Sequence, residues 1–336
     1  MEAVHATVAR PPGSVDRLAR LAAADMAVVD ALVRESMDSR VPLIPALAEH
    51  LIGAGGKRVR PLVAVAASRL VGGEGDAALK LAAAVEFIHT ATLLHDDVVD
   101  GSSLRRGKVA AHLIWGGASS VLVGDFLFAG AFELMVKAGS MRALDVLARA
   151  SRVIAEGEVL QLTSAHDLKL TKETYLRIIE GKTAELFAAA AEAGAIAGGA
   201  PEPRSQSMRD FGMNLGLAFQ LIDDALDYGG ASDVLGKNAG DDFREGKATL
   251  PLLLAIARSG PQEAGFWERT VGRRDQTEAD FKRARELIVG TGALQATLDL
   301  AYDYADAAKA SLRVFPDGEW KAALEDLADF TVSRSA

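Results

Sequence analysis

The fold class is decided by residues 81–100, which read LAAAVEFIHTATLLHDDVVD. Over Leu81–Leu94 apolar residues recur at i, i+3 and i+4, and Ala, Leu and Glu, all strong helix formers, dominate. This stretch lies inside residues 62–200, which contain no proline. A helix interior excludes proline, whereas a β-rich chain usually needs frequent turns. The pattern therefore predicts an all-α protein.

Similar periodicity predicts further helices along the chain. They are expected near residues 16–36, 41–53, 61–71, 76–100, 117–138, 141–165, 172–196, 205–228, 247–258, 278–289, 293–313 and 318–333. Loops are expected at 101–108, 197–204, 229–246, 259–277 and 314–317. The sequence has no sustained alternation of β-branched residues and no strand followed by a glycine-rich turn and a helix. A Rossmann domain and a P-loop are therefore disfavoured.

Composition excludes several classes of function. The chain has 336 residues, 37 Lys and Arg against 46 Asp and Glu, and a formal net charge of −9. Nucleic-acid binding needs a basic surface, so we expect no nucleic-acid partner. The chain has no cysteine, which excludes disulfides, zinc–thiolate sites, iron–sulfur clusters and thiol nucleophiles. Its length alone predicts about two domains.

Membrane and targeting segments are not expected. The N-terminal residues lack the apolar core of a secretory signal. The longest stretch free of Asp, Glu, Lys and Arg is Val109–Gly124, with 16 residues, whereas a spanning helix needs about 20. We expect a cytoplasmic protein without a transmembrane segment.

An aspartate motif occurs twice, as Asp96-Asp97-Val98-Val99-Asp100 and Asp223-Asp224-Ala225-Leu226-Asp227. On a helix the first and last aspartates of each motif lie about 40° apart, one turn along the same face. Like charges at this spacing destabilise a helix. Clustered carboxylates therefore need cations, and their oxygens suit Mg²⁺ bound jointly with phosphates. A solvated acidic face is the alternative, which the second copy and the apolar helix before each motif disfavour.

Basic residues occur beside glycines at several points. Backbone next to glycine can approach a phosphate closely. Together with two metal clusters, these residues suggest two diphosphate groups, one held through Mg²⁺ and one directly by Arg and Lys. The segments are Gly55–Pro61, Arg105–Lys108, Gly181–Thr183, Gly236–Lys237 and Gly246–Lys247.

Glu86 and His89 have the Glu-x-x-His spacing of di-iron helical bundles. Such a site needs a second copy of the motif and two further glutamates, and the sequence has no second copy. A di-iron site is therefore disfavoured. From the sequence pattern alone, His89 is expected to be a core histidine.

The chain resembles the trans-isoprenyl diphosphate synthase (polyprenyl synthetase) family. The resemblance covers residue 40 to the C-terminus, and the paired aspartate motifs with the GGKRVRP segment are its most specific part. It implies one all-α domain over residues 16–336, built as an isoprenoid-synthase helical bundle around a deep central cavity, with residues 1–15 flexible. It also implies a homodimer. The matching segments are Gly55–Pro61, Phe87–Gly107, Val121–Leu127, Gly181–Phe187, Leu215–Tyr228 and Gly236–Leu252.

The resemblance implies that an allylic diphosphate condenses with isopentenyl diphosphate. The implied metal is Mg²⁺, three ions per active site with substrate bound, for which Mn²⁺ can substitute. Its implied ligands are Asp96, Asp100 and Asp223, supported by Asp97, Asp224 and Asp227. Implied isopentenyl diphosphate contacts are Gly56, Lys57, Arg60, His89 and Arg106. Implied contacts to the allylic diphosphate are Arg105, Lys182, Thr183, Gln220, Lys237 and Lys247. The implied catalytic set is Asp96, Asp97, Asp100, Lys182, Thr183, Gln220, Asp223 and Asp224.

Two small residues bear on product length. Thr92 and Ala91 lie four and five residues before Asp96, which places them about 6–7.5 Å along the helix from the metal site. Aromatic residues there stop chain growth in the family. The chain also looks most like the synthases that make octaprenyl to decaprenyl diphosphate (about C40–C50) for quinone side chains. The prediction is therefore a long-chain product, and small residues chosen for helix packing alone are the alternative reading.

Three other functions compete with this one. A short-chain synthase making farnesyl or geranylgeranyl diphosphate differs only in its product. A terpene cyclase shares the first motif but usually mixes Asn, Ser or Thr and Glu in its second. A non-catalytic partner subunit that binds prenyl diphosphates typically lacks one cluster, whereas this chain keeps both. An almost insoluble product also makes transient contact with a membrane a hypothesis, although no basic amphipathic anchor is evident.

Overall fold

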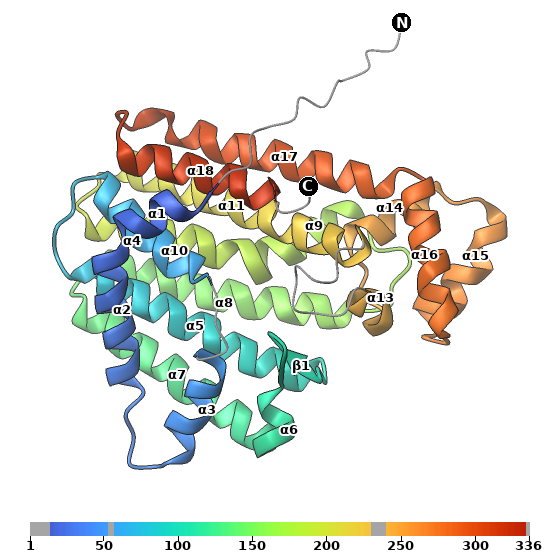
Figure 1. Ribbon diagram of the computed structural model, residues 1–336, viewed down its shortest axis with the longest axis horizontal. Helices are drawn as coiled ribbons and strands as arrows, with labels where there is room; N and C mark the ends of the chain where they lie inside the picture. The colour runs from blue at the N-terminus through green and yellow to red at the C-terminus, as the bar shows by residue number, and fades with distance from the viewer. Residues whose placement is uncertain (1–13, 53–56, 230–239, 334–336) are drawn as a thin grey trace, which may run out of the picture.

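A computed structural model describes residues 14–52, 57–229 and 240–333. The elements are almost entirely helical, as the sequence predicts (Figure 1). A small antiparallel hairpin joins β1 (Leu104–Arg105) to β2 (Lys108–Val109). The helices and helical turns are α1 (Asp16–Leu21), α2 (Ala23–Ser36), α3 (Leu43–Ile52), α4 (Val59–Leu70), α5 (Ala77–Val99), α6 (Ala111–Trp115), α7 (Gly117–Lys137), α8 (Met141–Thr163), α9 (Lys172–Ile179), the π-helical η1 (Glu180–Ala184), α10 (Glu185–Ala197), α11 (Glu202–Gly229), α13 (Asp241–Glu245), α14 (Leu250–Arg258), α15 (Pro261–Trp267), the π-helical η2 (Glu268–Gly272), α16 (Glu278–Gly290), α17 (Ala293–Ser311), the 3₁₀ turn η3 (Leu312–Val314) and α18 (Glu319–Ser333).

Helix α10 is the centre of the bundle. Every residue from Glu185 to Ala195 is buried, because α4, α5, α8 and α11 all pack against it. Figure 1 shows α10 between α4, α8 and α11. Alanine, which has no side-chain rotamer entropy to lose, dominates its sequence and lets neighbouring helices come close. Helix α5 is a second core helix that packs against α4 and α7.

Glycines set the closest approaches between these helices. A Cβ atom on Gly194 of α10 would lie 2.0 Å from the carbonyl oxygen of Ala64 on α4. A Cβ on Gly212 of α11 would lie 2.3 Å from the carbonyl oxygen of Phe187 on α10. Real Cβ atoms do not approach backbone so closely. These glycines therefore fix the position of α10 against both neighbours.

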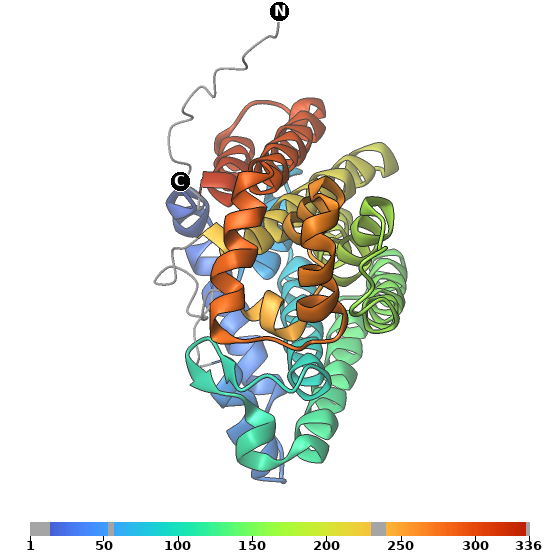
Figure 2. The same ribbon diagram turned by 90° about the vertical axis from the view of Figure 1, so that its right-hand side faces the viewer.

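The largest departure from the sequence prediction is at residues 259–277. They were expected to form a loop, yet α15 and η2 occupy Pro261–Gly272. Pro261 suits the first turn of a helix, and Trp267 and Val271 are buried. The helix was missed because few apolar residues mark its buried face. Figure 2 shows α15 and α16 side by side at this end of the molecule.

Smaller differences concern helix ends and breaks. The expected helix 16–36 is divided at Ala22, and the expected helix 172–196 contains the π-helical turn η1. The expected loop 101–108 holds the hairpin, whose turn residues Arg106 and Gly107 both have positive φ, as a tight two-residue hairpin turn requires. Helix α6 was not predicted, and α13 lies inside the expected loop 229–246.

Two described helices, α5 and α7, are long and apolar enough to cross a membrane by length and composition alone. The apolar segment of α5 is 72% buried, which identifies it as a core helix of the bundle. That of α7 is 39% buried, so much of its apolar surface lies outside the described core.

We predict that Gly194→Ala destabilises the protein. The new methyl group would meet the backbone of α4, which cannot move aside as a flexible side chain could. Overpacking of this kind should lower the free energy of unfolding by about 1–3 kcal/mol, measured by urea denaturation.

Gly265→Ala is the matched control. Gly265 is exposed on α15, and a Cβ atom added there would have no neighbour within 4 Å. Alanine favours a helix over glycine, so this variant should gain about 0.5–1 kcal/mol. Equal stability of the two variants would contradict the close approach of α4 and α10.

Candidate active site

The first aspartate cluster ends helix α5 and is neutralised by cations from distant elements. Carboxylates near a helix C-terminus are unfavourable because they oppose the helix dipole and repel one another. Each is paired with a basic side chain. The pairs are Asp96 with Lys182 at 3.5 Å, Asp97 with Arg105 Nε at 2.8 Å, and Asp100 with Lys247 at 3.0 Å. Of the three carboxylates, Asp97 is fully buried.

The second cluster lies on α11, and Asp224 is its most buried member. One carboxylate oxygen of Asp224 accepts a hydrogen bond from the Tyr175 hydroxyl at 2.5 Å, and the other accepts from Gln220 Nε2 at 2.7 Å. The side-chain oxygen of Gln220 accepts a hydrogen bond from Thr183 at 2.8 Å. Burial, and then the negative charge of Asp242, raise the pKa of Asp224 well above its ordinary value. Three predicted site residues thus form one hydrogen-bonded chain.

Asp227 anchors the segment that follows α11. Its carboxylate accepts hydrogen bonds from the backbone N–H groups of Gly240, Asp241 and Asp242 at 3.1–3.2 Å. Burial, and then the charge of Asp242, raise the pKa of Asp227 to about 7. Asp223 is half-buried on the same helix.

The π-helical turn η1 links the two clusters. Lys182 contacts Asp96 of the first cluster, while its neighbour Thr183 binds the chain that leads to Asp224 of the second. Helix α8 comes close to this turn because Gly157 has no side chain. A Cβ there would lie 2.6 Å from the backbone nitrogen of Lys182.

Glu158, which follows that glycine, was missed by the sequence analysis. Its carboxylate accepts a hydrogen bond from Lys182 Nζ at 2.6 Å. Burial, and then the charge of Asp96, raise the pKa of Glu158 to about 7. The only sequence signal was a Gly-Glu pair within a long helix, which carries no indication of the partner.

Lys247 is a second lysine at the first cluster. It pairs with Asp100 and, at 2.7 Å, with Glu245. Burial alone lowers the pKa of Lys247, but the charges of Asp242 and Asp100 outweigh burial and raise it. Asp242 was also missed, although its charge acts on Asp224, Asp227 and Lys247.

Arg60 and His89 form a separate basic part of the site. Arg60 Nη1 lies 3.3 Å from His89 Nε2. Burial lowers the pKa of Arg60 to about 10, so the guanidinium stays charged at neutral pH. Burial, and then the charge of Arg60, lower the pKa of His89 well below its ordinary value, so the imidazole is neutral. Its charged neighbour Arg106 lies in the hairpin turn, and burial lowers the pKa of Arg106.

The remaining predicted residues are placed as follows. Lys57 is exposed, with Nζ 4.2 Å from the ring centroid of Phe330 on α18. Ala91 is fully buried, and the half-buried Thr92 donates a hydrogen bond to the carbonyl oxygen of His89. Gly56 and Lys237 lie outside the described residues.

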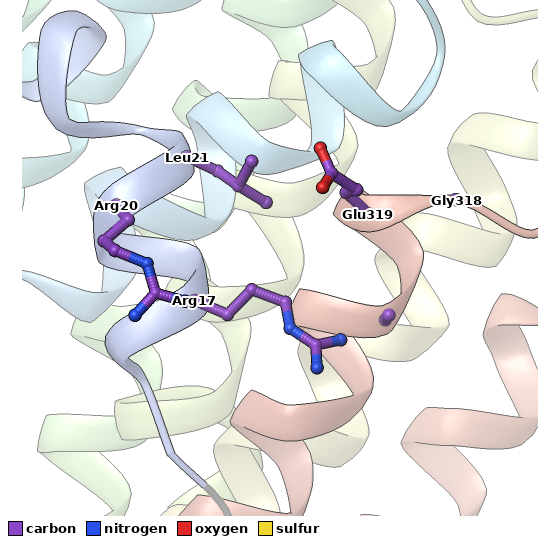
Figure 3. Close-up of a pocket in the computed structure, with 6 residues that line it drawn as sticks. Arg17, Arg20, Leu21, Gly318 and Glu319 are labelled. Carbon is purple, nitrogen blue, oxygen red and sulfur yellow. The ribbon is translucent and has the colours of Figure 1, made fainter.

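A recess of about 620 Å³ lies elsewhere, between α1 and the start of α18 (Figure 3). It is lined by Arg17, Arg20, Leu21, Gly318, Glu319 and Ala322, none of which is a predicted site residue. Arg17 is also paired with Asp326 at 3.3 Å. The deep central cavity beneath the first aspartate cluster stays a prediction.

In the part of the chain that the structure describes, no three Asp, Glu or His side chains come close enough to hold a metal ion. Lys182, Arg105 and Lys247 each pair with one carboxylate of the first cluster. The donor set is nevertheless one of hard carboxylate oxygens, which suits Mg²⁺ and similar ions.

Comparison with known proteins places this arrangement in a family. The chain is 46% identical to the octaprenyl diphosphate synthase of Escherichia coli (strain K12) over 321 residues, 96% of this chain and 99% of that protein. A crystal structure of polyprenyl synthase from Caulobacter crescentus CB15, complexed with calcium and isoprenyl diphosphate, is 73% identical and superimposes with a TM-score of 0.95, covering 98% of this chain and 100% of that chain. A decaprenyl diphosphate synthase structure from Rhodobacter capsulatus is 53% identical, with a TM-score of 0.92 and coverage of 96% and 100%. Residues 41–288 match the polyprenyl synthetase family, and this chain belongs to it.

Proposed function

We propose that this protein is a trans-polyprenyl diphosphate synthase, which condenses an allylic diphosphate with successive isopentenyl diphosphates into a long-chain product. One observation carries the proposal. Two carboxylate clusters from α5 and α11 are joined through adjacent residues of one turn, Lys182 and Thr183. The half-buried Arg60 and the neutral His89 provide a second polar region next to them. That is the arrangement two diphosphates would need.

Mg²⁺ is the proposed cofactor, with three ions per site when substrate is bound and Mn²⁺ as a substitute. Asp96, Asp100 and Asp223 would hold it. We assign supporting roles to Asp224 and Asp227, whose oxygens accept hydrogen bonds from Tyr175 and from backbone N–H groups, and to Asp97, which is fully buried beside Arg105. Bound with the substrate's phosphates, the metal supplies charge stabilisation for the departing diphosphate.

The chain's own residues do the rest of the work in this proposal. Lys182 and Arg105 would meet the allylic diphosphate after exchanging their carboxylate partners for phosphate oxygens. Lys237 and Lys247 are assigned to the same diphosphate. The hydrogen-bonded chain from Thr183 through Gln220 to Asp224 fixes two oxygen dipoles, which can stabilise an allylic cation. Isopentenyl diphosphate would bind at Gly56, Lys57, Arg60, His89 and Arg106.

A long product is favoured over the short-chain alternative. Ala91 and Thr92 leave the first turns before Asp96 free of bulky aromatic side chains. The named relatives make octaprenyl and decaprenyl diphosphates. A product of this length would serve as the side chain of a quinone. The non-catalytic alternative is disfavoured because both carboxylate clusters keep every aspartate.

The activity is tested with farnesyl diphosphate, labelled isopentenyl diphosphate and Mg²⁺, followed by chromatography of the dephosphorylated product. We expect octaprenyl to decaprenyl chains from the parent protein. Asp96→Ala and Asp223→Ala should each lower kcat by at least about a hundredfold while circular dichroism shows an unchanged fold. A product ending at farnesyl or geranylgeranyl would contradict the long-chain assignment. An inactive parent would favour the partner-subunit alternative.

Product length should depend on Ala91. Ala91→Phe places an aromatic ring where the growing tail must pass, so the product distribution should shift to shorter chains. Because Ala91 is fully buried, Thr92→Phe at the half-buried neighbouring position is a second test. Ala264→Phe, on the exposed side of α15, is the control and should leave the distribution unchanged. The same product length in all three variants would place the determinant elsewhere.

We also propose that two copies associate through α7. Its exposed stripe carries large apolar side chains along the helix, including Leu122 (67% exposed) and Val136 (66% exposed). Val159 and Leu162 are exposed apolar side chains of α8, which packs beside α7. A concentration of large exposed apolar side chains on one helix typically marks a protein interface. A cytoplasmic location and one domain over residues 16–336 remain predictions.

Leu122→Glu combined with Val136→Glu should convert a dimer into a monomer in sedimentation velocity. Neither side chain is buried in one chain, so the monomer should stay folded. Val289→Glu, at a 54% exposed position on α16, is the control and should leave the mass unchanged. A parent protein that sediments as a monomer would overturn this proposal.

A further inference from the structure

Arg60 is held in an unusual setting for a cation. Burial lowers the pKa of Arg60, because the charged guanidinium loses contact with water. Its Nε atom is buried and has no hydrogen-bond partner within the described residues. Its Nη1 atom meets His89, a neutral group. Residues Glu86 and Asp223 contribute favourable charge, whereas Arg106 opposes it. Something other than a direct ion pair must therefore fix the orientation of this side chain.

The ring of Phe187 does so. The guanidinium carbon of Arg60 lies 4.3 Å from the centroid of that ring. A cation over an aromatic face is attracted by the ring quadrupole, and more strongly when water is excluded. This contact uses the flat face of the guanidinium and consumes none of its N–H donors, which lie in the guanidinium plane. The donors at its edge stay available for a ligand.

The ring itself has little freedom to move. Phe187 is fully buried, and its ring centroid lies 5.6 Å from that of Phe219 on α11. Gly216 of α11 faces the same ring, since a Cβ on that glycine would lie 3.1 Å from a Phe187 ring carbon. The ring is therefore wedged between α11 and Arg60 of α4.

We propose that Phe187 is a positioning residue. Its ring holds the guanidinium of Arg60 against its face, so that the N–H donors of Arg60 are oriented toward the diphosphate of isopentenyl diphosphate. The inference rests on the proposed function, because it takes Arg60 as a ligand of that diphosphate. It adds a residue with no polar atom to the binding site, acting through the cation it supports.

Phe187 lies on the same helical segment as Thr183, a residue assigned to the allylic substrate. Thr183 lies four residues earlier, one turn before Phe187 along the continuous helix formed by η1 and α10. Thr183 binds Gln220 and Phe187 contacts Phe219, so both face the same turn of α11. One rigid helical segment thus carries a residue assigned to the allylic substrate and the support of Arg60.

Phe187→Leu tests the proposal, because it keeps an apolar side chain and removes the aromatic face. We expect the KM for isopentenyl diphosphate to rise about tenfold, with kcat and the KM for the allylic diphosphate within about twofold of the parent. Binding of isopentenyl diphosphate should weaken by the same factor in calorimetry. The calorimetric measurement needs no turnover, so it tests Phe187 even if the parent proves inactive and the proposed synthase function fails.

Fluorinated phenylalanines at position 187 separate electrostatics from shape. Successive fluorine atoms weaken the negative face of the ring while nearly preserving its size. Affinity for isopentenyl diphosphate should fall stepwise with the number of fluorines, which a purely space-filling role would not produce. A flat series would overturn the proposal.

Two controls complete the design. Phe211→Leu removes another fully buried ring, on α11, and should lower the melting temperature without altering either KM. With Arg60→Ala already present, Phe187→Leu should weaken isopentenyl diphosphate binding no further, because the side chain that the ring supports is gone. Parallel losses in kcat and both KM values for Phe187→Leu, or additive effects in the double variant, would show that the ring serves only the core and would overturn the proposal.

Discussion

The constraint on which the structure depends is the mutual repulsion of its clustered carboxylates. Six aspartates occur in two short helical segments, and a helix end offers carboxylates no favourable dipole at its C-terminus. Cations from other elements pair with the aspartates of the first cluster. They are Lys182 from η1, Lys247 before α14 and Arg105 from the hairpin. These ion pairs connect other segments of the chain, two of them distant in the sequence, to the end of α5. They are also contacts that a diphosphate with metal ions could replace one for one.

Close packing of helix backbones determines the positions of those cations. Gly194 and Gly212 let α4 and α11 lie directly against α10, and Gly157 brings α8 onto the turn that precedes it. With α10 fixed on three sides, the π-helical turn η1 is held between the two clusters. π-helical turns are rare and often occur at functional sites, since the extra residue redirects neighbouring side chains. Here adjacent residues, Lys182 and Thr183, contact different clusters.

The sequence predicts the parts of this site that repeat a pattern and misses the parts that depend on packing. The helical class and the repeated aspartate motifs follow from periodicity and spacing. Glu158, Tyr175 and Asp242 were missed because no local signal indicates that they meet Lys182, Asp224 and the second cluster across the fold. His89 was expected to be a core histidine from its pattern, and only the family resemblance gave it a role. The helical segment of α15 and η2 was missed because its buried apolar residues, Trp267 in α15 and Val271 in η2, are too few to show a period.

The two polar regions differ in how they handle charge, and this difference follows from burial. Around Asp96 and Asp224 the excess charge is negative. Burial raises the pKa values of Asp224, Asp227 and Glu158, which favours the neutral form of each carboxyl group. Around Arg60 the excess is positive, and burial keeps His89 neutral. In the proposed function, a diphosphate entering the first region would need added cations, whereas one entering the second would meet guanidinium groups directly. A single enzyme can therefore hold two diphosphates close together while only one of them is drawn toward metal-assisted departure.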